Sequence, residues 1–463
     1  MTQESFLIEL QSKEIEAGLF DYQIDGITIY KLIRRTIIEK KLRAIGLKVM
    51  ERRQGVVNRK ESIKNTLLSA WQICRLRISK HLASTVFVAY PRVDKVGDYF
   101  MDKFTDPLVS LCFDNKDVII FDQGRGGYHA KPRLHQKNCI QTEWYVVYAR
   151  LMSRLFYKRF YKLNKKVLDS LYNSLLNVFA SDLDSKKSLF MELYSSIIMI
   201  SCYEKMFRHL RIKRVLGPAR DFLRRGVIAA HRIGATSFEL QHGITYGETF
   251  MYGGYQPKEA TPDYFLAFGD NDPIDVYGID ADRIVNIGWA FDEYLSNIKG
   301  FVQYNEQDVL VISDPTITDA VIDAIVFLAQ AHPQSHFYVR PHPHEMISES
   351  QKRKLESVSN AHWQDNRINI ALVMRGFTHV IGENSTVLYE ALAAGKKTAK
   401  LFFEGLHPRY LKEEDKDCFW EVSDQDTFSR FLNEDISSKK TKSIYSPFNK
   451  ELFLRITGIK DNN

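Results

Sequence analysis

The sequence has few cysteines and lacks long apolar runs. No stretch approaches the roughly 18 uninterrupted apolar residues of a membrane-spanning helix. The first residues, MTQESFLIEL, are acidic and polar, whereas a secretory signal is basic and then apolar. Odd, isolated thiols without a CxxC pair argue against a zinc ribbon or a disulfide framework and suit a reducing cytoplasm, where we expect the protein to stay. The five cysteines are Cys74, Cys112, Cys139, Cys202 and Cys418.

Glycine and proline are also sparse, with 24 and 13 residues in a chain of 463. This scarcity excludes a collagen-like or low-complexity chain. Apolar residues make up 44% and charged residues 26%, which is ordinary for a folded protein and excludes disorder as the main state. Because one hydrophobic core rarely organises so long a chain, we expect two domains with appendages.

The net charge is +7, and the positive excess is concentrated in two segments. Residues 31–60 carry eleven Lys or Arg against two Glu, and residues 150–166 carry seven against none. The second segment is interleaved with apolar and aromatic residues, as in helices that lie on anionic membranes. The alternatives are nucleic-acid binding and a solvated helix face over a core stripe. No zinc-finger spacing or RNP-like motif supports nucleic acid, so we expect no nucleic-acid partner.

The order of helical and strand-like segments predicts an α/β protein with two Rossmann-like halves. Apolar residues recur at helical spacing over 29–38 and again from about 145 to 210. Short apolar runs alternate with helical segments over 211–291, and the alternation restarts after 306. Such alternation is the sequence form of βαβ units with a parallel sheet. The predicted parts are a helical N-terminal extension (1–83), a first Rossmann-like domain (84–291), a linker (292–306), a second Rossmann-like domain (307–436) and a C-terminal tail or helix (437–463).

Ligands of open parallel sheets bind beyond the carboxyl ends of the strands. Three segments place compact polar residues directly after an apolar run, and they cover residues 241–243, 340–344 and 382–386. We therefore predict that a ligand contacts these three segments.

The last of the three segments has the clearest mechanism. Ser385 or Thr386 would lie in the first turn of a helix, where unpaired backbone N–H groups and the helix dipole favour an anion such as phosphate. Glu390 follows one turn later, where a carboxylate can accept from two ribose hydroxyls. Glu383 and Asn384 belong to the same predicted phosphate loop. The alternative is that Ser385 only caps the helix and Glu390 is a solvated side chain.

Cationic side chains flank the prolines of the middle segment. Arg340, His342 and His344 would neutralise a phosphate, because the prolines fix the backbone that carries them. A lone histidine is usually structural, but two histidines and an arginine within five residues favour a functional interpretation.

His242 in the first segment precedes a glycine that permits a tight turn or a close backbone approach, and it is the candidate general base on an acceptor hydroxyl or, alternatively, a phosphate ligand. Asp221 and Glu248 are near it in the sequence and would complete the catalytic group. Asp270 begins a DxD pattern after a strand, but so short a pattern arises by chance, and we favour a capped turn over a metal site. The candidate acceptor or cleft residues are Arg220, Gln241, Gly243 and Asp270.

These segments, in their order, resemble the bacterial GT-B glycosyltransferases that build surface polysaccharides. The match lies within residues 210–405, in LQHG, YFLAFGD, NIGW, YVRPHP and IGENSTVLYEALAAGK. It is similar to the capsule and O-antigen transferases with an HP motif, a group that includes sialic-acid-like and Kdo transferases. The same order of a histidine-glycine turn and a PHP turn occurs in CDP-glycerol glycerophosphotransferases.

The resemblance implies two Rossmann-like domains that face a cleft, with the nucleotide donor on the second domain and the acceptor on the first. His342, Ser385 and Thr386 would contact the donor phosphate, Glu390 the ribose, and His242 would lie near the acceptor. Families of this fold usually need no metal ion and no cofactor beyond the nucleotide sugar.

The implied activity is transfer of a sugar, with a CMP-sugar such as CMP-Kdo favoured, to a growing or lipid-linked surface polysaccharide. The basic-aromatic segments would then bring the enzyme to the anionic inner membrane. Transfer of a polyol phosphate and a non-catalytic GT-B scaffold are the alternatives. The spacing from Glu383 to Glu390 is one residue short of the paired-glutamate motif of many retaining enzymes, so the stereochemistry stays open.

Overall fold

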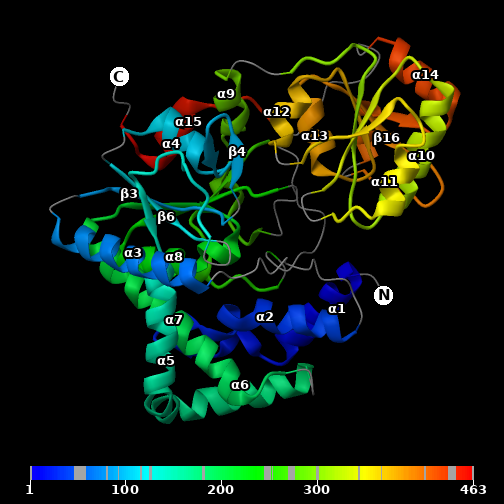
Figure 1. The fold of residues 1–463 in the computed structure, drawn as a ribbon. Coiled ribbons are helices and arrows are strands. Elements are labelled where there is room, and N and C mark those ends of the chain that lie inside the picture. The colour runs from blue at the N-terminus through cyan, green and yellow to red at the C-terminus, as the bar shows by residue number, and fades with distance from the viewer. Residues whose placement is uncertain are drawn as a thin grey trace.

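Two parallel β-sheets and a separate group of helices make up the computed structural model (Figure 1). The structure describes residues 3–45, 59–79, 82–91, 93–114, 117–124, 128–179, 183–243, 252, 254–269, 277–298, 302–342, 345–366, 368–410, 413–435 and 445–460. No described helix combines the length and the apolar character that crossing a bilayer requires.

The first sheet has seven strands, and every neighbouring pair is parallel. In spatial order they are β11 (Ile284–Asn286), β10 (Tyr264–Ala267), β9 (Thr236–Leu240), β8 (Arg214–Pro218), β3 (Thr85–Val88), β6 (Val118–Asp122) and β7 (Cys139–Gln141). This is the Rossmann order 3-2-1-4-5-6 with one more strand at the edge. The order reverses between β3 and β8, which is where ligands of such sheets bind.

Helices cover both faces of the first sheet because successive strand residues point to opposite sides. In β3, Val86 and Val88 pack under one set of helices, whereas Phe87 packs under the other. The first set is α3 (Arg59–Ile78), α5 (Glu143–Leu163), α7 (Lys186–Leu210) and α8 (Arg220–Ile233). The second set is α4 (Asp106–Cys112), α9 (Ala290–Ser296) and α15 (Lys450–Thr457).

The second sheet has six parallel strands in the Rossmann order. In spatial order they are β14 (Ala361–Trp363), β13 (Phe337–Arg340), β12 (Val309–Ile312), β15 (His379–Gly382), β16 (Lys397–Leu401) and β17 (Trp420–Val422). Its outer face carries α10 (Thr318–Ala331), α11 (Glu349–Leu355) and α14 (Gln425–Asn433). Its inner face carries α12 (Ile370–Arg375) and α13 (Thr386–Ala393).

One apolar cluster joins the inner faces of the two sheets. Phe87 and Leu216 from the first sheet belong to the same cluster of buried side chains as Leu310 and Val380 from the second. The expected α/β class, with two Rossmann-like domains in a GT-B arrangement, is therefore confirmed.

The remaining helices form a third core. Helix α1 (Gln3–Glu16), the short hairpin of β1 (Gln23–Ile24) and β2 (Ile27–Thr28), helix α2 (Ile29–Ala44) and helix α6 (Lys165–Phe179) lie below the first sheet (Figure 1). Their apolar side chains pack with Phe160 of α5 and Phe190 of α7. The N-terminal extension is mainly helical, as predicted, but it shares its core with residues that the sequence assigned to the first Rossmann-like domain. Helical spacing predicts helices and does not identify their packing partners, which explains this correction.

Some of the cations in the basic segment 31–60 are buried and do not lie on the surface. Lys31 is buried and donates to the carbonyl of Tyr255 at 2.9 Å, and burial lowers the pKa of its ammonium well below the usual value. Arg34 is buried in an ion pair with Glu14 at 2.7 Å. Residues 46–58 lie outside the described part of the chain. The described cations at the start of this segment therefore hold the third core together.

The predicted linker and tail both differ from plain connections. The linker 292–306 begins inside α9, because Phe291 and Leu295 are buried in the shared cluster. The tail forms the expected terminal helix, α15, and this helix returns to the first domain, where Phe453 is fully buried. Before it, the backbone of Ser446 donates to the Phe268 carbonyl at 2.7 Å. Residues 437–444 of the predicted tail are outside the described residues.

Gly288 tests how the tail is held. Its φ is +76°, and a Cβ there would lie 2.0 Å from the carbonyl oxygen of Pro447. We expect Gly288→Ala to lower the thermal midpoint far more than Gly395→Ala, whose φ is +69° and whose Cβ would meet nothing within 4 Å. The control carries only the backbone cost of about 1 kcal/mol. Equal shifts of the two midpoints, measured by calorimetry, would show that the tail does not pack closely on this glycine.

Candidate functional site

The loop that follows β3 crosses to the second domain. It contains a hairpin of β4 (Asp94–Val96) and β5 (Tyr99–Met101), and Lys95 pairs with Ile368 in an isolated β-bridge. Asn369, which caps α12, donates from Nδ2 to the carboxylate of Asp94 at 3.2 Å. The carboxyl end of the first sheet's central strand is therefore tied to the second domain.

An ion pair spans the two domains just after this hairpin. The Lys103 ammonium lies 3.2 Å from Oε1 of Glu390 in α13. The same ammonium lies over the rings of Phe104 at 5.3 Å and Trp289 at 5.7 Å. The Lys103 side chain is 30% exposed and that of Glu390 is 9% exposed, so the pair is accessible from one side. Glu390 is not the solvated side chain of the alternative interpretation, since its carboxylate faces the first domain.

Buried carboxylates fix the residues on either side of this lysine. Asp102 accepts from the backbone N–H groups of Tyr90 at 2.9 Å and Phe104 at 3.0 Å. Asp106 accepts from the backbone of Asp102 at 2.6 Å and pairs with Arg133. Burial raises the pKa of Asp106 to about 7, and the nearby Arg133 opposes that rise. Hydrogen bonds to these two buried carboxylates thus fix the backbone of the loop that carries Lys103.

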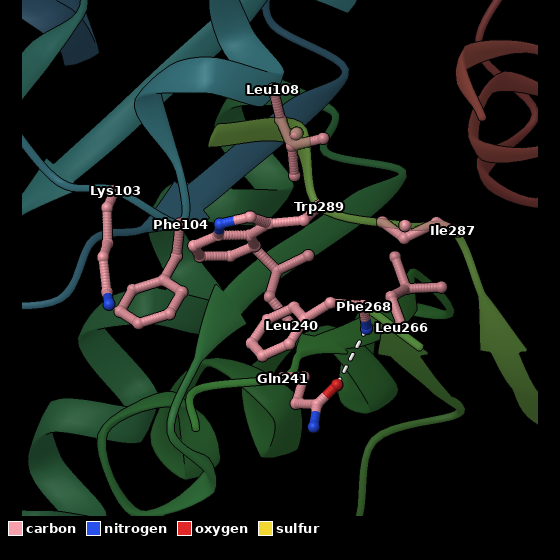
Figure 2. Close-up of a pocket in the computed structure, with 11 residues that line it drawn as sticks. Lys103, Phe104, Leu108, Leu240, Gln241, Leu266, Phe268, Ile287 and Trp289 are labelled. Carbon is pink, nitrogen blue, oxygen red and sulfur yellow. Dashed lines mark hydrogen bonds between the residues drawn. The ribbon is translucent and has the colours of Figure 1, made fainter. Parts of the chain in front are cut away.

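A small, mostly apolar hollow lies beside the lysine (Figure 2). Phe104, Phe268 and Trp289 supply aromatic walls, and the Lys103 side chain lies beside the ring of Phe104. Gln241 also lines the hollow, as predicted for a cleft residue. Its amide is occupied by the sheet, because Oε1 accepts from the backbone of Phe268 at 2.8 Å and Nε2 donates to a carbonyl at 3.2 Å.

His242 lies next to this hollow, packed against two aromatic rings that also contact each other. Its imidazole is 4.5 Å from the ring of Tyr90 and 5.2 Å from the ring of Phe104, measured between centroids. The half-buried Gly243 has open space around it and does not adopt a positive φ. His242 thus lies among aromatic side chains of the first domain, and its predicted role as a base stays a prediction.

Arg220 and Asp221 have structural partners. Arg220 is fully buried, donates to Glu239 at 2.8 Å and reaches the carbonyl of Tyr277. Asp221 pairs with Arg35 at 3.1 Å and Arg224 at 2.7 Å. As they stand, these two side chains stabilise the start of α8 and offer no group to an acceptor or to His242. The predictions of Arg220 as a cleft residue and of Asp221 as a catalytic residue are corrected, because a buried charge needs a close partner.

Ser385 is the N-cap of α13. Its hydroxyl accepts from the backbone of Val387 at 3.2 Å, which is the role that the alternative interpretation gave it. Thr386 is the first residue of the helix and is half-buried. Of the two hydroxyls predicted to hold phosphate, Thr386 is the one that does not serve as the cap.

Glu383 and Asn384 secure the loop that precedes the helix. The Glu383 carboxylate accepts from the backbone of His407 at 2.6 Å, and Asn384 exchanges hydrogen bonds with the backbone of His407 and Arg409. The buried Lys400 donates to the Glu383 carbonyl at 2.9 Å, and burial lowers its pKa to about 8. These side chains shape the loop, and their predicted direct contact with phosphate is corrected to a supporting role.

Arg340 is likewise committed within the second domain. Its guanidinium donates to the carbonyls of Asp365 and Ile368, and burial lowers its pKa to about 10. The predicted contact with a phosphate is wrong for the described arrangement. The arginine ties the loop after β14 to the end of β13 instead.

Glu345 controls the turn that carries His342. This buried carboxylate accepts from the Ser313 hydroxyl at 2.7 Å, the Thr318 hydroxyl at 2.6 Å and the backbone of His342 at 2.7 Å. Since β12 lies between β13 and β15, the turn stands at the same edge of the sheet as the start of α13. His342 and Thr386 are thus placed at the edge where a ligand of this sheet binds.

Sequence reasoning missed Lys103, Glu345 and the aromatic neighbours of His242. Lys103 lies in FMDKFTDPL and Trp289 ends NIGW, but no local pattern pairs the lysine with a glutamate 287 positions later. Three predicted residues, Glu248, His344 and Asp270, lie outside the described residues. Among the described residues, no group of His, Cys, Asp or Glu is arranged to hold a metal ion.

Comparisons with known proteins give likeness of fold alone. No protein-family model matches the chain, and no curated protein matches it significantly. A UDP-GlcNAc 2-epimerase from Neisseria meningitidis bound to UDP-GlcNAc is 13% identical, with 81% of this chain and 98% of that chain covered and a TM-score of 0.49. Apo OtsA is 10% identical, with 81% and 99% covered and a TM-score of 0.42. The apo lipopolysaccharide outer core galactosyltransferase WaaB is 11% identical, with 75% and 88% covered and a TM-score of 0.41.

Glu345→Gln tests the support of the His342 turn. The amide nitrogen cannot accept, so at least one buried donor loses its partner, at a cost of about 1–3 kcal/mol. We expect a lower urea midpoint, followed by the fluorescence of Trp363 and Trp420 in the second domain. The control is Glu349→Gln, whose side chain is 77% exposed and whose effect should stay within about 0.5 kcal/mol. Matching midpoints for the two variants would contradict the role of Glu345.

Proposed function

We propose that the chain is a glycosyltransferase that moves a sugar from a nucleotide-activated donor to a growing or lipid-linked bacterial surface polysaccharide. The observation that carries the proposal is the Lys103–Glu390 ion pair, which joins the loop after β5 to the helix after β15. Ligands of Rossmann sheets bind at the loops after the strands. A donor on one domain would therefore meet an acceptor on the other.

The donor phosphate is proposed to lie at the start of α13. The helix dipole and the backbone N–H groups of the first turn attract an anion, and the Thr386 hydroxyl adds a donor. His342 follows β13 at the same edge of the sheet. The resemblance to HP-motif transferases favours a CMP-sugar such as CMP-Kdo, and we propose that no metal ion or further cofactor is used.

Lys103 and Glu390 would exchange partners when the donor binds. The ammonium would turn from the carboxylate to the phosphate, and the carboxylate would accept from the ribose hydroxyls. Neutralising the phosphate lowers the charge that develops on the leaving nucleotide, which stabilises the transition state in a site that excludes water. The pair is accessible from one side, so this exchange needs no unfolding of the loop.

On the acceptor side, His242 is the proposed general base. Packing against Tyr90 and Phe104 orients the imidazole, and the hollow beside Trp289 offers an apolar wall to a sugar ring. A lipid-linked acceptor stays in its membrane, so peripheral contact with the inner leaflet belongs to this proposal. Polyol-phosphate transfer and a non-catalytic scaffold remain alternative functions, because the same groups would hold a CDP-polyol or an unreacted nucleotide.

A thermal-shift panel of CMP, UDP, GDP, ADP and CDP-glycerol tests the donor site. A ligand that binds only the folded state at 100 times its Kd stabilises it by about 2.7 kcal/mol, so the matching nucleotide raises the midpoint. We expect Thr386→Val and Lys103→Met each to weaken that nucleotide about tenfold, since each removes one phosphate contact. Ser429→Ala, in α14 on the outer face of the second sheet, is the control and should bind normally.

Each outcome of the panel separates the functions. If none of the nucleotides raises the thermal midpoint, the proposed function is contradicted altogether. Product analysis by mass spectrometry then distinguishes a transferred sugar from an epimerised donor, and CMP with a new phosphodiester identifies polyol-phosphate transfer. Binding without turnover of any donor favours the scaffold.

His242→Gln tests the base independently of the donor. The glutamine cannot take up the acceptor proton, so turnover should fall by about 10²–10⁴ while the nucleotide-induced thermal shift stays unchanged. His209→Gln, an exposed histidine at the end of α7, is the matched control. A parallel loss of nucleotide binding in His242→Gln would assign this histidine to the donor, and unchanged turnover would remove it from the mechanism.

A further inference from the structure

Helix α3 exposes a row of large apolar residues. A helix on the surface of a globular protein normally buries its apolar residues. In α3 the buried side combines Asn65 and Ser69 with the core residues Ile73 and Leu76. On the other side, Leu67 and Trp71 are 64% and 56% exposed. The exposed apolar residues fall at i, i+4, i+8 and i+15, which places them in one row along the helix: Ile63, Leu67, Trp71 and Ile78.

Helix α5 carries a second exposed apolar row. Its buried residues Tyr145, Ala149 and Ser153 face α7 and the first sheet. On the opposite side, the spacing i, i+4, i+7 and i+11 lines up exposed apolar residues, and Leu155 is 63% exposed. This second row consists of Trp144, Tyr148, Leu151 and Leu155.

The two helices are in contact and lie on the side of the first domain away from the second sheet (Figure 1). The backbone of Trp144 donates to the Ser69 hydroxyl at 3.1 Å, so the start of α5 sits against the middle of α3. We call the two exposed rows and their flanking cations the α3–α5 face. The acidic residues of the two helices, Glu61 and Glu143, are both half-buried. The exposed cations are Arg59, Lys60, Lys64, Arg75 and Arg77 on α3, and Arg150, Arg154, Lys158, Arg159 and Lys162 on α5.

We propose that the α3–α5 face lies on an anionic membrane surface, with both apolar rows in the headgroup region and the cations at lipid phosphates. Burying the apolar residues in the membrane interface favours insertion, and the cations are attracted to the negatively charged headgroups of anionic lipids. The aromatic rings of Trp71, Trp144 and Tyr148 suit the boundary between headgroups and acyl chains. Large exposed apolar patches of this kind mark interaction sites.

Other occupants fit the face less well. Interfaces with nucleic acid are polar, so Ile63 and Leu67 would gain nothing there. A second copy in a two-fold contact would place the same cations against each other. Only a partner that is both negatively charged and apolar matches all the exposed side chains. This inference rests on the proposed function, whose peripheral membrane contact it assigns to the α3–α5 face, but its evidence is the exposed side chains of this face and not the donor site.

Vesicle sedimentation tests the proposal without any substrate. The full chain should bind phosphatidylcholine vesicles that contain phosphatidylglycerol, bind pure phosphatidylcholine at least tenfold less, and lose affinity as salt rises. Lipids brominated near the headgroup should quench Trp71 and Trp144. The quenching should disappear in the double variant Trp71→Phe and Trp144→Phe, which leaves Trp289, Trp363 and Trp420 in place.

Paired variants distinguish vesicle binding through the α3–α5 face from non-specific vesicle binding. Leu67→Ser with Leu155→Ser removes apolar contacts, and Arg154→Glu with Lys158→Glu reverses charge, and each pair should weaken binding at least tenfold. The controls are Ile15→Ser on α1, which is 58% exposed, and Arg353→Glu on α11. All altered side chains are exposed, so the thermal midpoint should be unchanged and nucleotide binding should be kept.

Three results would overturn the proposal. The first is equal vesicle binding by the face variants and the wild type. The second is binding of duplex DNA or RNA at physiological salt with none to vesicles. The third is a wild-type dimer that Leu67→Ser with Leu155→Ser converts to a monomer, again without vesicle binding. None of these outcomes affects the donor site, so failure here and failure of the transferase proposal are distinguishable.

Discussion

The apolar cluster shared by the inner faces of the two sheets determines where every candidate group lies. It contains strand residues of both domains and side chains of α4, α9, α12, α13 and α15. Because close-packed side chains resist displacement, the cluster fixes the edge of one sheet relative to the edge of the other. The Lys103–Glu390 pair forms at the border of this cluster, where the Phe104 and Trp289 rings shield one side of the ammonium. The position of this ion pair therefore depends on the apolar packing between the two sheets.

Charge in this protein divides into internal ties and surface groups. Arg220 begins the helix after β8 and Arg340 ends β13, and both are buried with donors on a carboxylate or on backbone carbonyls. A buried guanidinium without a partner would destabilise the fold by more free energy than these contacts contribute, so each arginine needs a partner within the fold. The cations left for ligands are the partly exposed ones, Lys103 in the cleft and the series along α3 and α5.

The sequence predicted the two Rossmann-like domains because strand and helix periods are local properties, legible in runs such as those of β12 and α10. Contacts between segments that are distant in the chain could not be predicted from such local patterns. Nothing near Lys103 indicates Glu390, and nothing in 160–197 indicates that its apolar side chains complete the core of α1 and α2. At Ser385 the two interpretations required the same residue, since a cap and a phosphate ligand are both hydroxyls at a helix start, and only the bond to Val387 separates them. The location of His242 was predictable from strand order, whereas its aromatic neighbours come from loops of the first domain.

The chain passes between the domains twice, after α9 and again after α14, since α15 belongs to the first domain. The second domain is therefore inserted between two stretches of the first. A chain shortened after α14 would lose part of the first domain's core, because Phe453 of α15 is fully buried there.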